Sequence, residues 1–485
     1  MRLALDRLGS VLDSSTGESW SGARLAEEAE ARAARLRALD VGRGARVLVR
    51  HGGTPAFFAD LFALWQVGAC AACLNPELTT PELETVAAFV RPAFTISVAG
   101  MADAPPAVGR TVALGDERLP RSDDRAADAV GALDDPALIL FTSGTTGTPK
   151  GVVHTFRSLL ARLALNRLHI PAAERRVTLC PLPTHFGHGL IGNALTVLID
   201  GGDLVLARGA NLRTAAALGT LIDQYGVGFM SSVPTLWKIV TKAAKPPTKG
   251  TLRRVHVGSA PLSADLWKQI VVWSGTRNVV NMYGITETAN WIAGASAAEF
   301  EPEDGLIGRM WGGSAGVCSA DGRIRATGEG EIALQTPSLM QGYYERPELS
   351  GAALRGGWFM TGDIGRIDSD GVMRLVGRQK HEINRAGLKV HPEDIDVLLE
   401  RHESVREACA FGVPDEIAGE IVAVALAPAD GGTLDLAELK RWAAGRLARE
   451  KLPERWYVLD EIPKTDRGKI NRDTVARACT TLTPR

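Results

Sequence analysis

A polar loop that directly follows an apolar run constrains this chain more than any other feature of its sequence. Residues 137–141 read Ala-Leu-Ile-Leu-Phe, which is typical of a buried β-strand, and every residue from Thr142 to Gly151 is Ser, Thr, Gly, Pro or Lys. Glycines let a backbone approach a polyanion closely, while clustered N–H groups and hydroxyls hydrogen-bond to phosphate oxygens. Lys150 adds a positive charge. The segment therefore predicts a phosphate-binding loop at the end of a buried strand.

Two better-known glycine-rich phosphate motifs do not fit this chain. A mononucleotide P-loop needs Gly-x4-Gly-Lys-Ser/Thr, but counting from Gly144 puts Pro149 where the second glycine belongs. A dinucleotide fingerprint opens a helix, whereas the pair Gly42 and Gly44 precedes a predicted strand. An ordinary polar loop remains the alternative interpretation of the segment.

The spacing of apolar residues predicts an α/β fold. Residues 24–39 and 55–67 read as helices, and residues 45–50 and 69–74 as the strands that follow them. Further runs that look like buried strands lie at residues 203–206, 227–231, 254–257 and 278–282. Short apolar runs between helical stretches are typical of layered α/β sheets with largely parallel strands.

The pattern changes near residue 305. Short strands with glycine turns at residues 330–334, 363–367 and 371–376 predict an antiparallel or barrel-like subdomain. Beyond it, a compact α+β pattern combines helices at residues 392–401 and 435–449 with strands at residues 405–411 and 421–427. We therefore expect a large N-terminal domain over residues 1–377 and a small C-terminal domain over residues 378–485, joined at Gly377.

Composition and charge argue against several classes of protein. The chain has 485 residues, 45% apolar and 23% charged, and a formal net charge of −1, which gives no support to binding of nucleic acid or an anionic membrane. No apolar run is long enough to span a membrane, and no signal peptide is visible. The six cysteines are scattered, and Cys70 and Cys73 lack a second pair at zinc spacing. We expect buried thiols in a reducing cytoplasm.

Six segments, taken in order, resemble the motifs of one family. The loop at residues 142–151 resembles the phosphate-loop signature of the ANL superfamily of adenylating enzymes, which includes acyl- and aryl-CoA synthetases, peptide-synthetase adenylation domains and beetle luciferases. The later segments are Val-Gly-Ser-Ala-Pro-Leu at 257–262, Asn-Met-Tyr-Gly-Ile-Thr-Glu at 281–287, Trp-Phe-Met-Thr-Gly-Asp at 358–363, Gly-Arg-Gln-Lys at 377–380 and Ile-Pro-Lys-Thr-Asp-Arg-Gly-Lys-Ile at 462–470. The resemblance covers essentially the whole chain and implies a small, mobile C-terminal domain.

The resemblance also implies which residues bind ATP. Tyr283 would flank the purine, Asp363 would accept hydrogen bonds from both ribose hydroxyls, and Arg378 would reach the ribose. Thr286 would contact phosphate, and Glu287 would hold Mg²⁺, which prefers hard oxygen ligands. The full implied ATP and AMP set is Thr142, Ser143, Gly144, Thr145, Thr146, Gly147, Lys150, Gly258, Ser259, Ala260, Asn281, Met282, Tyr283, Gly284, Asp363 and Arg378.

The C-terminal motifs imply two half-reactions. Lys469 matches the catalytic lysine, which would bridge the carboxylate and the α-phosphate during adenylation. Lys380 would be the hinge about which the C-terminal domain rotates, and Ala386 and Gly387 would then face the incoming thiol. The chain departs from the family at Asn384, where lysine is common, and this puts in doubt a secondary contact to the intermediate.

The acyl pocket is implied by residues 181–189 and by the residues after Gly258 and Glu287, with His185, Phe186, Gly187, His188 and Trp291 as the candidate lining. In relatives that activate amino acids an aspartate follows the matching phenylalanine, whereas this chain has glycine. A buried ammonium without a counter-charge is costly, which disfavours an α-amino acid. The two histidines would either face the acid or pack beside it.

The resemblance implies an ATP- and Mg²⁺-dependent ligase that converts a carboxylic acid to an acyl-adenylate, releases pyrophosphate and passes the acyl group to coenzyme A. The first alternative acceptor is the phosphopantetheine of a carrier protein, acting in trans because no carrier module follows Lys469. A luciferase-like oxygenase would share the motifs, and a non-catalytic nucleotide-binding protein would share the fold. No motif bears on the identity of the acid or on the oligomeric state.

Overall fold

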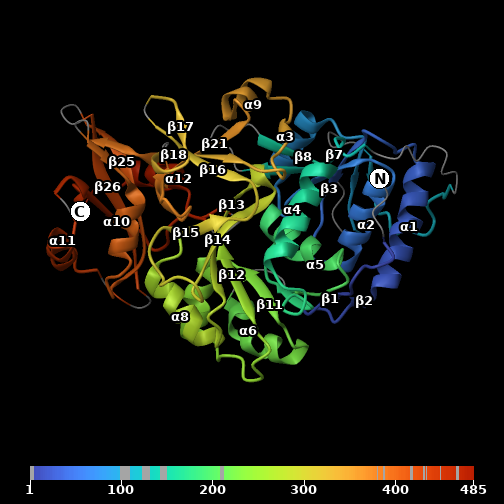
Figure 1. Ribbon diagram of the computed structural model, residues 1–485, viewed down its shortest axis with the longest axis horizontal. Coiled ribbons are helices and arrows are strands. Elements are labelled where there is room, and N and C mark those ends of the chain that lie inside the picture. Colours follow the sequence, from blue (N-terminus) through green and yellow to red (C-terminus); the bar gives the residue numbers. More distant parts are fainter. Residues whose placement is uncertain are drawn as a thin grey trace. The chain divides into compact units, whose positions relative to one another are not determined.

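The computed structural model describes residues 5–98, 110–122, 132–142, 150–207, 212–319, 321–378, 381–385, 388–415, 419–429, 432, 434–447, 449–465 and 469–484 (Figure 1). The chain divides into two compact units. Unit 1 comprises Met1–Asp304, Gly308–Ser314 and Gln335–Phe359. Unit 2 comprises Gly305–Ile307, Ala315–Leu334 and Met360–Arg485.

Unit 1 contains a seven-stranded sheet that includes the two strands flanking the predicted phosphate loop. In spatial order its strands are β19 (Gly342–Tyr343), β8 (Lys150–Thr155), β7 (Pro136–Thr142), β4 (Cys70–Cys73), β3 (Arg46–Val49), β5 (Phe94–Ile96) and β6 (Thr111–Val112). From β7 to β6 the strands are parallel, while β8 and β19 add to β7 in antiparallel pairs. The loop therefore connects a central parallel strand to an antiparallel neighbour, and both of its ends are fixed by sheet pairing.

The second sheet region of unit 1 is also mainly parallel. Its strands, in spatial order, are β14 (Asn290–Ser296), β13 (Val279–Ile285), β12 (Arg254–Gly258), β11 (Phe229–Ser232), β9 (Val177–Cys180), β10 (Asp203–Leu206), β1 (Val11–Asp13) and β2 (Ser19–Trp20). Neighbours from β13 to β1 are parallel, and the outer pairs β13–β14 and β1–β2 are antiparallel. Strand β15 (Leu306–Met310) pairs with β14 through Arg309 and Met310.

Helices cover these strands, and their starts follow capping chemistry. They are α1 (Gly22–Ala38), α2 (Pro55–Gln66), α3 (Thr80–Val90), α4 (Phe156–His169), α5 (Thr196–Leu198), α6 (Leu212–Tyr225), α7 (Pro234–Ala243), α8 (Ala264–Ser274), α9 (Pro347–Ala353), the π-helix η2 (His188–Leu195) and the 3₁₀ turn η3 (Thr286–Thr288). The hydroxyls of Ser21, Thr54 and Thr155 accept hydrogen bonds from first-turn amides, as N-caps do. Short strand β20 (Leu354–Arg355) follows α9.

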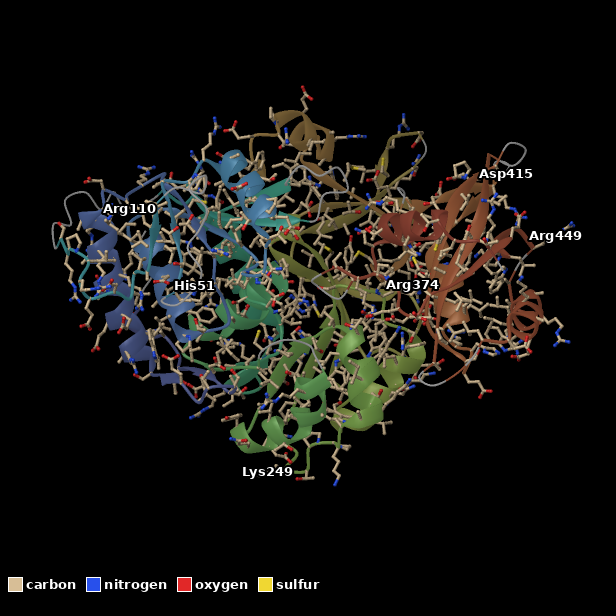
Figure 2. The ribbon with its side chains drawn as sticks, turned by 180° about the vertical axis from the view of Figure 1, so that it is seen from behind. His51, Arg110, Lys249, Arg374, Asp415 and Arg449 are labelled. Carbon is tan, nitrogen blue, oxygen red and sulfur yellow. The ribbon has the colours of Figure 1, made fainter. Side chains whose placement is uncertain are left out.

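Helices α1 and α2 run side by side at the N-terminal side of unit 1 (Figure 1). Almost every residue of α2 is buried, so this helix lies in the core. A buried charge cluster ties the pair together, because Asp60 of α2 lies 2.8 Å from Arg32 Nε of α1 and 2.8 Å from His51 Nε2, the histidine labelled in Figure 2. Paired burial of this kind compensates the cost of removing each charge from water.

Unit 2 consists of an antiparallel β-region and an α+β region. The first has β16 (Ser314–Cys318), β17 (Ile324–Arg325), β18 (Gly328–Gln335), β21 (Trp358–Ile367) and β22 (Met373–Arg378). The second has β23 (Ile383–Arg385), β24 (Leu388–Val390), β25 (Val405–Asp415), β26 (Gly419–Pro428), β27 (Arg455–Val458), α10 (Pro392–Leu399), α11 (Leu436–Ala444), η5 (Arg449–Lys451) and α12 (Arg472–Thr480). Separate apolar clusters line its five-stranded sheet.

The predicted fold class is confirmed, with layered α/β sheets, a β-rich region and a small α+β region. The predicted helix at residues 435–449 is shorter, because α11 stops at Ala444 with Gly445 as its C-cap. The expected domain boundary at residue 377 stays a prediction, although the division into units already assigns residues 360–377 to unit 2. Over the part of the chain that the structure describes, no helix has the length and apolarity needed to cross a membrane.

Candidate active site

Three side chains from three elements of unit 1 meet beside the phosphate loop. Lys150 is the first residue of β8, Glu287 lies in η3, and Tyr343 ends the edge strand β19. The Lys150 Nζ atom lies 3.4 Å from Glu287 Oε1 and 3.9 Å from the centroid of the Tyr343 ring. The Tyr343 hydroxyl donates to the same Glu287 Oε1 at 2.8 Å. Sequence reasoning identified Lys150 and Glu287 but missed Tyr343.

The turn that carries Glu287 is held from both sides. The amide of Met340 donates to the Glu287 carbonyl at 2.8 Å, and His154 Nε2 of β8 donates to the Thr286 carbonyl at 2.8 Å. The chain leaves the turn through two non-glycine residues at positive φ, Ala289 at 59° and Asn290 at 108°. Such backbone costs free energy and persists only where its surroundings determine it. The Glu287 side chain therefore projects from a backbone with little freedom.

Burial sets the protonation of the groups around this turn. His154 is fully buried, and burial lowers its pKa to about 4 even though the Thr286 carbonyl and the Glu287 carboxylate favour the charged form. Its imidazole is therefore neutral near pH 7, with the proton on Nε2. Burial, together with the neighbouring Glu287 carboxylate, raises the pKa of the Tyr343 phenol. Tyr343 therefore remains a hydrogen-bond donor.

The strand end at Gly258 and Ser259 lies beside a candidate acyl-pocket histidine. Ser259 has a positive φ of 70°, and its Oγ lies 2.8 Å from His188 Nδ1. The other ring nitrogen, Nε2, lies 2.6 Å from Ser231 Oγ on β11. Two hydroxyls, each able to donate or accept, thus fix the His188 ring whichever tautomer it takes. Ser231 was not anticipated from the sequence.

Trp291 packs against His188. The two rings meet edge to face at 5.5 Å, and Trp291 also contacts His256 at 4.6 Å between ring centroids. His188 begins the π-helix η2, and π-helical turns are frequent at functional sites. A side chain added at Gly192 of η2 would meet Asn290 Nδ2 at 1.7 Å. The helix and β14 are therefore in direct contact at this point.

The remaining acyl-pocket candidates lie on the loop that leads into η2. The rings of His185 and Phe186 contact each other at 4.0 Å, and His185 is buried. A Cβ at Gly187 would come within 3.3 Å of Leu140 on β7. The structure thus brings Gly187 against β7, the strand that precedes the predicted phosphate loop.

The candidate purine-side residues lie on β13. Asn281, Met282 and Tyr283 are buried, and a Cβ at Gly284 would meet the Asn290 carbonyl at 2.4 Å. The register of the β13–β14 pair shifts between Tyr283 and Gly284, which is the local irregularity that turns the chain into η3. Ala260 lies with Ser259 in the bend that follows β12.

In unit 2, the candidate ribose ligands occupy opposite positions of one antiparallel pair. Asp363 on β21 pairs with Arg378 on β22. The Asp363 side chain is buried, and its amide donates to Thr361 Oγ1 at 3.0 Å. Two residues that were predicted from separate motifs are therefore cross-strand neighbours in the structure.

Lys469, the candidate catalytic lysine, lies on a short hairpin of unit 2. The hairpin closes through a bridge between Lys464 and Ile470 and through the Thr465 amide, which donates to the Lys469 carbonyl at 2.8 Å. The Lys469 side chain is exposed. Two basic neighbours form ion pairs at 2.6 Å, Lys464 with Glu407 and Arg472 with Asp396.

Several predicted site residues lie outside the described residues. These are Ser143, Gly144, Thr145, Thr146, Gly147, Lys380, Ala386 and Gly387. For Thr142, Arg378 and Asn384 the structure describes the backbone only. Among the described residues no group of three or more His, Cys, Asp or Glu side chains forms a metal site. Glu287 nevertheless fits Mg²⁺, because this ion is commonly held by one or two carboxylates together with substrate phosphates.

The fold and the site define an adenylate-forming enzyme, and comparisons with known proteins agree. A family model described as "AMP-binding enzyme" matches residues 5–344, and one for its C-terminal domain matches residues 394–469. A feruloyl-CoA synthase of Amycolatopsis sp is 31% identical over 460 residues, 91% of this chain and 90% of the relative. An oxalate–CoA ligase of Arabidopsis thaliana is 33% identical over 359 residues, 73% of this chain and 70% of the relative.

The fold agrees as well. The crystal structure of ATP-bound MatB from Rhodopseudomonas palustris matches with a TM-score of 0.87 at 25% identity and covers 99% of each chain. The chain belongs to the AMP-binding enzyme family, within the ANL superfamily of adenylate-forming enzymes. The predicted class, an AMP-forming acid–thiol ligase, is thereby confirmed.

Proposed function

We propose that this protein joins a small or medium carboxylic acid to AMP at the expense of ATP and then passes the acyl group to coenzyme A. The observation that carries the proposal is the contact of Lys150, Glu287 and Tyr343 at the end of the phosphate loop. An anionic carboxylate must approach an anionic α-phosphate, so positioned cations supply most of the help that a protein can give.

Each residue of the site has one proposed task. Lys150 holds the pyrophosphate end of ATP, and Thr286 contacts phosphate. Glu287 holds Mg²⁺, which supplies neutralising charge on the phosphate oxygens when bound. Lys469 bridges the attacking carboxylate and the α-phosphate, and its exposed position on a closed hairpin supports that task.

The nucleoside has its own proposed set of contacts. Asp363 accepts hydrogen bonds from the ribose hydroxyls, and the register that sets it opposite Arg378 supports a shared role. Tyr283 flanks the purine, with Gly258, Ser259 and Ala260 on its other side. Further proposed contacts come from Thr142, Ser143, Gly144, Thr145, Thr146, Gly147, Asn281, Met282 and Gly284.

The acyl pocket is proposed to lie between the loop before η2 and the start of β14. The aromatic contact of His188 with Trp291, and the hydroxyls that fix His188, support a pocket with a rigid wall. The named relatives act on acids as different as oxalate and ferulate, so the family leaves acid size open. Gly187, which stands where an aspartate would pair with an ammonium, disfavours α-amino acids.

Thiol transfer is proposed to follow rotation about Lys380, with Ala386 and Gly387 facing the pantetheine and the boundary between domains at residues 377–378. The CoA ligases among the relatives support coenzyme A as acceptor. A carrier protein in trans is the second candidate. The six free cysteines support a reducing, cytoplasmic location.

ATP–pyrophosphate exchange across a panel of carboxylic acids tests the adenylation step. Lys469→Ala should lower acid-dependent exchange by about 100-fold or more. Lys249→Ala, which removes an exposed lysine at an outer end of unit 1 (Figure 2), should leave exchange unchanged. ATP binding without exchange for any acid of the panel would instead indicate a nucleotide-binding protein without catalytic activity.

Addition of CoA to the adenylate tests the second step. Release of acyl-CoA supports the proposed acceptor, whereas an adenylate that persists with CoA and is discharged by a phosphopantetheinylated carrier protein would support the alternative. Lys380→Pro should block thiolysis and spare exchange. Equal loss of both half-reactions in this variant would contradict the hinge assignment.

A further inference from the structure

Tyr343 touches both charged residues of the phosphate end of the site, and no motif assigned it a role. We propose that Tyr343 is a positioning residue with two separable parts: its hydroxyl orients the Glu287 carboxylate toward Mg²⁺, and its ring holds the Lys150 ammonium for the nucleotide. The inference rests on the proposed function of these two residues.

The Tyr343 ring is fixed before any ligand binds. Tyr343 pairs with Val152 across the β19–β8 edge, and its amide donates to Ser350 Oγ at 2.9 Å. The side chain is buried in an apolar cluster with Val152, Met340 and Phe359. A donor whose ring cannot rotate freely defines one direction for its hydroxyl oxygen, and Glu287 Oε1 lies in that direction at 2.8 Å.

The hydroxyl acts on the carboxylate. Met340 holds the Glu287 backbone through its carbonyl, and Tyr343 holds the far end of the side chain through Oε1. Oε1 is thus engaged by the phenol, and the second carboxylate oxygen is held in a set orientation. A hydrogen bond to an ionised group is about twice as strong as one between neutral groups, so its loss releases the carboxylate.

The ring acts on the lysine. The Lys150 ammonium lies 3.9 Å from the ring centroid, within the range of a cation–π contact, while its distance to Glu287 Oε1 is 3.4 Å. When ATP phosphates become the main partner of Lys150, the ion pair with Glu287 is weakened but the ring contact is kept. The ring therefore holds the ammonium near the phosphate loop in both states.

The next residue in the chain offers a matched control. Tyr344 follows β19 in a turn and is partly buried; its hydroxyl donates to the Val90 carbonyl at 3.2 Å and its ring packs on Phe89 at 5.4 Å. Tyr343 and Tyr344 therefore differ in their partners but not in their chemistry. Loss of the hydroxyl at either position removes one hydrogen bond from the same short segment.

The experiment compares Tyr343→Phe, Tyr343→Leu and Tyr344→Phe. Calorimetry measures ATP binding to each protein without metal and then with increasing Mg²⁺, and exchange kinetics give the Mg²⁺ concentration for half-maximal rate. Tyr343→Phe should raise that concentration about tenfold and leave metal-free ATP binding unchanged. Tyr343→Leu should in addition weaken metal-free ATP binding by about threefold to tenfold. Tyr344→Phe should match the wild type in both measurements.

The outcomes separate the inference from the proposed function. If the Phe variant keeps the wild-type Mg²⁺ dependence, or if it weakens metal-free ATP binding as much as the Leu variant, the two-part role of Tyr343 is refuted. If each variant loses ATP affinity in proportion to the decrease in its melting temperature, the role of Tyr343 is only structural and the inference fails. If the wild type itself shows no Mg²⁺-dependent ATP binding, the proposed function fails instead.

Discussion

Replacement of the buried histidine His256 should stabilise the protein, and the gain in unfolding free energy should be larger at acidic pH. It lies in β12, is fully buried, and is surrounded by the rings of Phe229, Trp291 and Trp311. Neither of its ring nitrogens has a hydrogen-bond partner among the described residues. Burial lowers the pKa of His256 well below 6.5, and the charges of Arg254 and His188 lower it further.

The expected gain in unfolding free energy follows from two independent effects. An unpartnered buried polar group costs about 1–3 kcal/mol, which methionine, of similar volume, would recover near pH 7. An imidazole in the unfolded chain takes up a proton below a pKa of about 6.5, whereas the buried ring does not. The folded state therefore loses stability as the pH falls below that value. Between pH 7 and pH 5 the loss can reach at most about 2 kcal/mol, the limit that protonation of the unfolded imidazole sets.

Urea unfolding followed by tryptophan fluorescence tests this reasoning. His256→Met should be more stable than the wild type by about 1 kcal/mol or more near pH 7, and the difference should widen near pH 5, by up to about 2 kcal/mol. His154→Met is the matched control, because His154 is equally buried but donates to the Thr286 carbonyl. This control should be less stable than the wild type near pH 7. A His256→Met protein that is less stable at neutral pH, or whose advantage does not grow in acid, would refute the argument.

Three further predictions concern other parts of the fold. Arg472→Met leaves the largely buried Asp396 carboxylate without its cation and should cost about 3–5 kcal/mol, measured by urea unfolding. Gly308 has a φ of 72°, and a Cβ there would lie 2.0 Å from the Gly294 carbonyl, so Gly308→Ala should cost at least about 2 kcal/mol in a thermal melt. Cys318 is the one cysteine that is not buried, so the native protein should react rapidly with a thiol reagent at one site and the denatured protein at six. A rapid reaction at more than one site would contradict this burial pattern.

Much of the fold could be predicted because local chemistry and tertiary packing agree there. The expected helix at residues 55–67 became α2, which starts at a threonine N-cap followed by proline. The expected strand at residues 45–50 became β3, whose apolar residues are buried. The Cys70–Cys73 pair is buried in β4, as its apolar context indicated, and burial raises the pKa of Cys70 to about 12.

The candidate site could be predicted only in part, because a sequence motif identifies residues but not the contacts that they make in the fold. Lys150 and Glu287 were found from two separate motifs, and the structure brings them within 3.4 Å. Tyr343 could not be found, because its approach to Glu287 depends on the register of a two-residue edge strand 56 positions away in the chain. No periodicity or composition encodes that register.

Ion pairing separates two of the basic residues near the C-terminus from the proposed chemistry. Lys464, Lys469 and Arg472 lie within nine positions of one another, and their charges alone do not distinguish them. Lys464 pairs with the buried Glu407 and Arg472 with the largely buried Asp396, both at 2.6 Å, and these pairs hold the two side chains to the core of unit 2. A charge that is committed to a buried pair is costly to withdraw, so neither residue is suited to follow a transferring phosphoryl group. Lys469, which the family motif predicts to be catalytic, has an exposed side chain, and the ion pairs of its two neighbours agree with that prediction.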